Sequence, residues 1–144
     1  ELDGVIIPDL PPEEAYPLAA ALAARRVDQI FLIAPTPDEN RMADVAARSR
    51  GFLYLVSLKG TTGARDHLPA HLSNFVARVR QTTDLPQAVG FGISTPDQAA
   101  HVAKIADGVI VGSALIRAIN EAEGDATAAA RSFIGSFRSA MDEG

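Results

Sequence analysis

Hydrophobic residues along the chain alternate between short continuous runs and longer stretches with helical spacing. The continuous runs are bounded by turn residues, and they occupy residues 5–7, 30–33, 52–56, 88–91 and 109–111. Apolar runs of this length are typical of strands that are buried on both faces of a parallel sheet. The pattern therefore predicts five parallel strands.

The stretches between these runs have the terminal residues of helices. Thr95 and Gln98 are spaced as a capping box, and Pro96 would occupy the first helical position. Residues 12–26 and 37–48 start with proline and carboxylates, which suits the positive end of the helix dipole, and residues 67–82 carry a one-sided apolar stripe. We expect helices at residues 12–26, 37–48, 67–82, 95–105 and about 125–141.

Strict alternation of strand and helix predicts an α/β fold with a parallel sheet and right-handed crossovers. An open doubly wound sheet is one possibility, but a dinucleotide site would need a third glycine that residues 90–95 lack. A partial (β/α)8 barrel is the other, because a whole barrel takes about 250 residues. We expect one domain over 1–144, with five βα units and a short extra helix after the last strand.

Composition narrows the class of protein. The 144 residues carry a formal net charge of −5 and no cysteine, which disfavours nucleic acid or an anionic membrane as partner and excludes disulfides and thiol chemistry. No apolar stretch is long enough to span a membrane, and no secretory signal is visible. We expect a cytoplasmic protein. The chain starts almost inside a strand, without Met, and so looks cut.

Two glycine segments are the strongest indication of a binding site. Residues 90–96 and 108–114 each form an apolar run that breaks at glycine just before a helical pattern. A helix N-terminus beside glycine backbone attracts anions, because free N–H groups and the positive dipole end face the ligand. In barrels the loops after the last two strands commonly bind a substrate phosphate. The sequence therefore predicts a phosphate site.

Groups for acid–base chemistry are scarce. Asp9 would stand at the carboxyl end of a strand, where barrel enzymes place catalytic residues, whereas Asp107 precedes a strand and belongs to the opposite end. His67 and His71 are four residues apart but lack a third ligand, so we expect no metal site. Residues 57–65 are rich in hydroxyls and glycine and suit a lid. The sequence therefore predicts a phosphate site and a lid, but no pair of groups for acid–base catalysis.

Taken in order, several segments resemble the tryptophan synthase alpha chain family. The resemblance extends over essentially all 144 residues and corresponds to the family's barrel from the fourth strand to the C-terminus. The matching segments are residues 3–14, 31–36, 54–57, 60–65, 89–94 and 108–114.

The resemblance implies a (β/α)8-barrel lyase that cleaves indole-3-glycerol phosphate to indole and glyceraldehyde 3-phosphate by a retro-aldol reaction in tryptophan biosynthesis. It implies that Thr62 orients a catalytic aspartate. The implied phosphate-binding residues are Gly63, Gly90, Phe91, Gly92, Gly112 and Ser113, and the implied indole-pocket residues are Tyr54, Ile6, Leu32 and Ile110. Both catalytic carboxylates of the family would precede residue 1, so we expect the 144 residues alone to be inactive.

The resemblance also implies a partner, the tryptophan synthase beta chain, and no cofactor in this chain itself. Loops of the family's contact surface are partly missing, which weakens the expected docking. The alternative is a non-catalytic barrel fragment that keeps the phosphate site and self-associates as a homo-oligomer, because exposed edges and apolar faces drive association. Another phosphate-binding barrel enzyme is a third possibility, against which the 60–65 lid argues.

Overall fold

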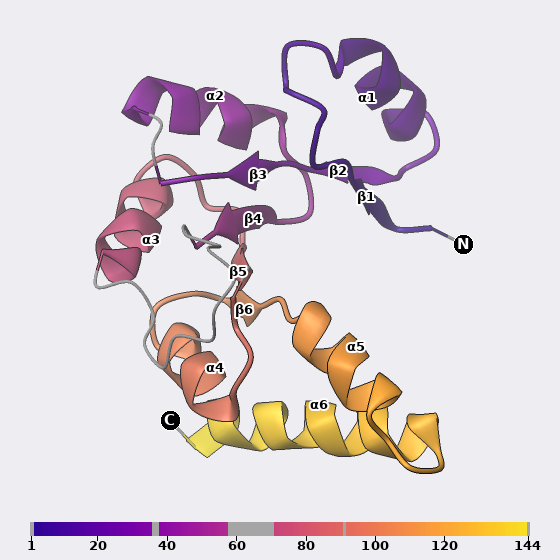
Figure 1. Ribbon diagram of the computed structural model, residues 1–144. Helices are drawn as coiled ribbons and strands as arrows, with labels where there is room; N and C mark the ends of the chain where they lie inside the picture. Colours follow the sequence, from indigo (N-terminus) through magenta and orange to yellow (C-terminus); the bar gives the residue numbers. More distant parts are fainter. Residues whose placement is uncertain (1, 36–37, 58–70, 91, 144) are drawn as a thin grey trace.

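A computed structural model describes residues 2–35, 38–57, 71–90 and 92–143, and in these residues strands and helices alternate as expected (Figure 1). The strands are β1 Gly4–Ile6, β2 Asp28–Ile30, β3 Leu32–Ile33, β4 Leu53–Val56, β5 Gln87–Gly90 and β6 Gly108–Val109. The helices are α1 Tyr16–Ala23, α2 Glu39–Arg48, α3 Leu72–Arg80, α4 Pro96–Ala103, α5 Ser113–Asn120 and α6 Ala126–Glu143.

All strand pairs are parallel, and every strand pairs with a neighbour in the chain. β1 pairs with β2, and the larger sheet has the order β3-β4-β5-β6. Helices α2, α3 and α4 follow one another along one side of this sheet (Figure 1). The mixed α/β fold with parallel strands is confirmed, and α5 is the short extra helix expected after the last strand.

The second apolar run forms two strands instead of one. Ile30 is opposite Ile6 in β1, whereas Leu32 is opposite Tyr54 in β4. Between them the N–H of Phe31 donates to the hydroxyl of Ser49 at 3.0 Å and so bonds a side chain instead of a strand. Hydropathy alone could not predict this division, because the run is apolar throughout.

The expectation that the strands are buried on both faces is wrong. On the face that packs against the helices, Leu53, Leu55 and Val89 are fully buried. The alternating residues Tyr54 and Ala88 are only half-buried. We call this second side, which includes Leu32, Val56 and Gly90, the inner face. The hydrophobic core therefore lies between sheet and helices, and the inner face remains accessible.

The first helix begins later than its proline pair predicts. The carbonyls of Pro11 and Pro12 accept N–H bonds from Glu14 and Ala15, at 3.0 and 3.3 Å, which makes a turn. Helix α1 then starts at Tyr16 with proline in its first turn. Proline suits this turn because its ring fixes φ at a value that turns use, and it has no N–H with which to extend a helix.

The C-terminal helix completes the core. Helix α6 packs against α4 and α5, and the rings of Phe133 and Phe137 stack with centroids 4.5 Å apart. Phe137 is buried in the same cluster as residues of β4 and β5. In the described ranges, no helix combines the length and hydropathy that crossing a membrane requires.

Candidate functional site

Neighbouring strands bring together much of the predicted site on the inner face. Leu32 in β3 is opposite Tyr54 in β4. Gly90 ends β5, and the N–H of Ile110 donates to the carbonyl of Val89 at 2.8 Å, just after β6. The sheet thus gathers apolar and aromatic groups beside a glycine. Ile6 lies apart from them on β1, 41% exposed.

Tyr54 lies directly over Gly90. A Cβ placed on Gly90 would come within 2.6 Å of ring atom Cε1 of Tyr54, closer than real carbon atoms approach. The ring can therefore cover the strand only because residue 90 has no side chain. Burial raises the pKa of the Tyr54 hydroxyl, so this group is protonated and neutral at physiological pH.

The first glycine segment leads into a helix that caps itself. Gly92 has φ +80°, a left-handed conformation that favours glycine. The Thr95 hydroxyl then accepts from the N–H of Gln98, and the Gln98 side chain accepts from the N–H groups of Ser94 and Thr95. This capping box was expected, and it occupies N–H groups at the start of α4 that an anion would need.

The second glycine segment leads into a helix without such a cap. Gly112 is the N-cap of α5, and no described side chain accepts from the first N–H groups of this helix. Gly112 and Ser113 are both exposed. These N–H groups and the positive end of the dipole can therefore receive an anion from solvent.

Part of the predicted site falls outside the described residues. These positions are Thr62, Gly63 and Phe91, the rest of the 60–65 lid, and His67. His71 is described and is the N-cap of α3. Among the described residues, no group of three His, Asp or Glu side chains could hold a metal ion.

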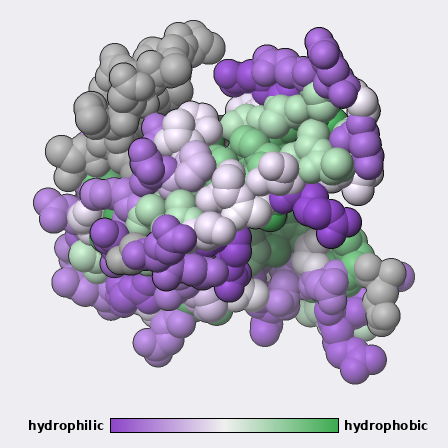
Figure 2. Space-filling model, turned by 90° about the horizontal axis from the view of Figure 1, so that it is seen from below, coloured by the Kyte–Doolittle hydropathy of each residue, from purple (hydrophilic) through white to green (hydrophobic). Residues whose placement is uncertain are grey.

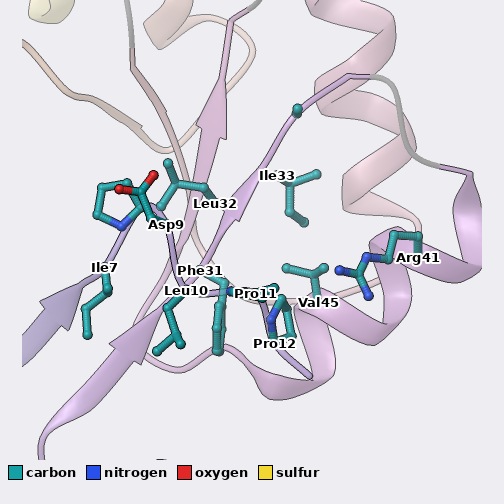
Figure 3. A pocket seen from close by; sticks show the side chains of 12 residues that line it. Ile7, Asp9, Leu10, Pro11, Pro12, Phe31, Leu32, Ile33, Arg41 and Val45 are labelled. Carbon is teal, nitrogen blue, oxygen red and sulfur yellow. The ribbon is translucent and has the colours of Figure 1, made fainter. Parts of the chain in front are cut away.

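A pocket of about 460 Å³ lies beside the inner face (Figure 3). The loop after β1 forms one wall, and β3 and α2 form the other. Asp9 and Arg41 are its charged residues, and they lie on opposite sides of it. Of the site residues that the resemblance implies, Leu32 is the one that lines this pocket among the described residues.

Sequence reasoning missed Arg41, a charged residue of this pocket. The guanidinium of Arg41 bonds the Glu13 carboxylate and lies 3.7 Å from Asp44, and so fastens the loop after β1 to α2. Isolated charges that meet only in the folded chain leave no spacing pattern to find.

Asp107 has the structural role expected of it. Its carboxylate accepts from the N–H of Gln87 at 2.8 Å and from Arg80 at 2.9 Å. These partners, the backbone N–H foremost, hold the pKa of Asp107 below its ordinary value. The ion pair joins the start of β6 to α3. It lies at the amino end of the sheet, whereas the N-termini of α4 and α5 follow the carboxyl ends of their strands.

Comparison with known proteins gives the family. The family model described as tryptophan synthase alpha chain matches residues 1–142. The tryptophan synthase alpha chain of Dehalococcoides mccartyi is 55% identical over 118 residues, which are 82% of this chain and 46% of that protein. That of Citrifermentans bemidjiense is 46% identical over 143 residues, 99% of this chain and 52% of that protein.

Solved structures agree. A tryptophan synthase structure from Mycobacterium tuberculosis matches with a TM-score of 0.85 and 40% identity, over 96% of this chain and 51% of that one. The alpha subunit from Legionella pneumophila matches with a TM-score of 0.82 and 36% identity, over 98% and 52%. This chain thus spans about half the length of its relatives and matches their C-terminal portion. It belongs to the tryptophan synthase alpha chain family.

Proposed function

We propose that the inner face and the start of α5 bind indole-3-glycerol phosphate. The phosphate contacts the exposed N–H groups at Gly112 and Ser113, and the indole ring lies against Tyr54, Leu32 and Ile110. The observation that carries this proposal is the uncapped N-terminus of α5, which directly follows the strand beside the inner face. An anion there would gain several backbone hydrogen bonds together with the helix dipole.

We further propose that the 144 residues provide binding without turnover. Retro-aldol cleavage breaks the bond between indole and the glycerol carbon, and it needs one group to accept a proton and another to donate one. The resemblance assigns these roles to two carboxylates before residue 1. Each such group typically contributes about 10²- to 10⁴-fold in rate, so losing both removes measurable activity.

An indole-release assay tests this proposal. The 144-residue chain is assayed with indole-3-glycerol phosphate, alone and mixed with a second polypeptide that carries the first three barrel strands of a relative. We expect no indole from the chain alone and release from the mixture. Indole release by the chain alone would overturn the proposed inactivity, and failure to bind glycerol phosphate in a titration would overturn the proposed site.

The beta chain is the proposed macromolecular partner. The matching Mycobacterium tuberculosis structure is described as tryptophan synthase, without restriction to the alpha chain, which supports this assignment. We propose that a complete barrel docks tightly and that these 144 residues dock weakly, because the resemblance implies that they carry only part of the family's contact loops. Calorimetric titration of a relative's beta chain with this chain and with a full-length alpha chain would reveal the difference, and equal affinities would refute it.

Self-association is the second candidate function, and exposed apolar residues favour it. Ile6 and Ile7 at the end of β1 are 41% and 38% exposed. Figure 2 shows its largest hydrophobic area at the upper right of the face that it draws, beside hydrophilic residues, with smaller hydrophobic areas elsewhere on this face. Static light scattering decides between the candidates: a defined dimer supports self-association, and a monomer at high concentration contradicts it.

A further inference from the structure

Ser57 holds one carbonyl with two donors. It follows β4 directly and is 6% exposed. Its N–H donates to the carbonyl of Gly90 at 3.1 Å, and its hydroxyl donates to the same oxygen at 2.9 Å. The acceptor is the last residue of β5, where the chain leaves the sheet.

The hydroxyl bond is more than the sheet requires. In a parallel ladder each carbonyl needs one N–H donor, which Ser57 already provides through its backbone. The second bond restrains the orientation of the Gly90 peptide unit, because a planar peptide cannot turn without moving its oxygen. Gly92, two residues further on, has the left-handed conformation described above. Restraint at Gly90 therefore limits the directions in which the chain reaches Gly92.

Gly92 and the start of α5 emerge from paired strands. Val89 in β5 is opposite Val109 in β6, and the Ile110 N–H extends this pairing by one residue. Each strand ends within a few residues of these contacts, so both glycine segments leave the same end of the sheet. A rotation of the peptide at Gly90 would change the geometry on one side of the proposed anion site.

We propose that Ser57 is a positioning residue for a phosphate monoester: through the Gly90 carbonyl it fixes Gly92 beside the N-terminus of α5. This inference rests on the proposed function. Ser57 acts through Gly90 and needs no contact with the ligand.

Ser49 provides a matched control. It is also a serine that is 6% exposed, and it also bonds backbone, accepting from Phe31 at 3.0 Å and donating to the carbonyl of Phe52 at 3.3 Å. It ends α2, in the connection ahead of β4, whereas Ser57 directly follows β4. Ser49→Ala and Ser57→Ala thus remove the same buried group on the two sides of one strand.

The test is a titration of the ¹⁵N-labelled chain with inorganic phosphate, followed by NMR, with urea unfolding of each variant. We expect Ser57→Ala to weaken phosphate binding about fivefold, the equivalent of one hydrogen bond. Ser49→Ala should change it less than about twofold, although it loses a comparable bond. The Gly92 amide signal should shift, and its hydrogen exchange should accelerate, in Ser57→Ala alone.

Equal weakening in both variants, or no weakening in Ser57→Ala, would overturn the positioning role. If the unmodified chain binds no phosphate, the proposed function fails. The exchange rate of the Gly92 amide then still decides whether Ser57 holds this turn: an unchanged rate refutes it, and a faster rate in Ser57→Ala alone supports it.

Discussion

The two glycine segments look alike in sequence and differ in the structure. Each follows a strand and precedes an eight-residue helix. The helix after the first segment is closed by the Thr95–Gln98 capping box, whereas α5 starts at Gly112 without a side-chain cap. The capping box therefore occupies donors at the start of α4, whereas the start of α5 leaves its donors for a ligand.

The glycines themselves are present for different reasons. Gly90 makes room for the Tyr54 ring, and Gly92 has a positive φ. Gly112 has a negative φ of −117°, and a Cβ added to it would meet no described atom within 4 Å. The fold thus requires glycine in the first segment. In the second, the bare backbone is free to approach a ligand.

The largest expected effect is on folding at Gly90. Gly90→Ala should lower the free energy of unfolding by about 1 to 3 kcal/mol, because its methyl group forces the Tyr54 ring aside. Urea denaturation measures the loss. Gly112→Ala is the matched control, and we expect a change below about 0.5 kcal/mol. Equal losses of unfolding free energy in the two variants would show that both segments are crowded, and would contradict the proposed difference between them.

Next in size is an effect on binding at α5. Ser113→Asp places a carboxylate at the proposed phosphate position, so phosphate affinity should fall more than about tenfold through repulsion. Stability should be kept or rise slightly, because a carboxylate suits a helix N-terminus. Calorimetry with inorganic phosphate provides the measurement, with Ser113→Ala as the uncharged control. Unchanged phosphate affinity in Ser113→Asp would show that the anion does not bind at the N-terminus of α5.

The α4 cap should affect stability without affecting binding. Thr95→Ala removes the side chain that accepts from Gln98 and should cost about 1 kcal/mol in urea denaturation. Phosphate affinity should stay within about twofold of that of the unmodified chain, because the lost hydroxyl is uncharged and caps α4, not α5. Thr95→Ser keeps the hydroxyl and should behave like the unmodified chain. A large loss of phosphate affinity in Thr95→Ala would mean that both helices bind the anion.

The smallest expected effect lies just before the second segment, at Asp107. Its pKa is lowered in the folded chain, so its charge stabilises the fold above its unfolded pKa of about 3.9, and this contribution disappears as pH falls through the lowered folded value. Asp107→Asn should cost about 0.5 kcal/mol at pH 7, because the pair with Arg80 is half-exposed.

The cost should shrink as the pH falls below about 4. Denaturation at several pH values checks this, with the exposed Arg138–Asp142 pair as reference: Asp142→Asn should have almost no effect. A cost that grows with acidification would contradict the assigned role of Asp107.

Much of the fold could be predicted because its signals are local. The capping box, the apolar runs and the helical stripes are each made of residues close together in the chain, and most of the corresponding elements occur near the expected residues. The division at Phe31 depends on Ser49, which is distant in sequence. The half-exposed inner face depends on what packs against it, and no local pattern encodes that.

The site was predictable only in outline. Resemblance singled out Tyr54 and Gly90, but their direct contact depends on strand register. The sequence predicted one anion site shared by the N-termini of α4 and α5, because glycine content does not reveal which of these helices has a side-chain cap. Arg41 and Ser57 could not be found from the sequence, because their partners, Glu13 and Gly90, are 28 and 33 residues away.

The order of the strands has a consequence for how the chain assembles. Within each of the two sheets every strand pairs with its neighbour in the chain, so each pairing closes a loop of one helix and its connections. Loop-closure entropy grows slowly with length, and here it is similar at every step. Folding can therefore start at any βα unit and spread in both directions. The sheet behaves in this respect like a repeat protein bent into an arc.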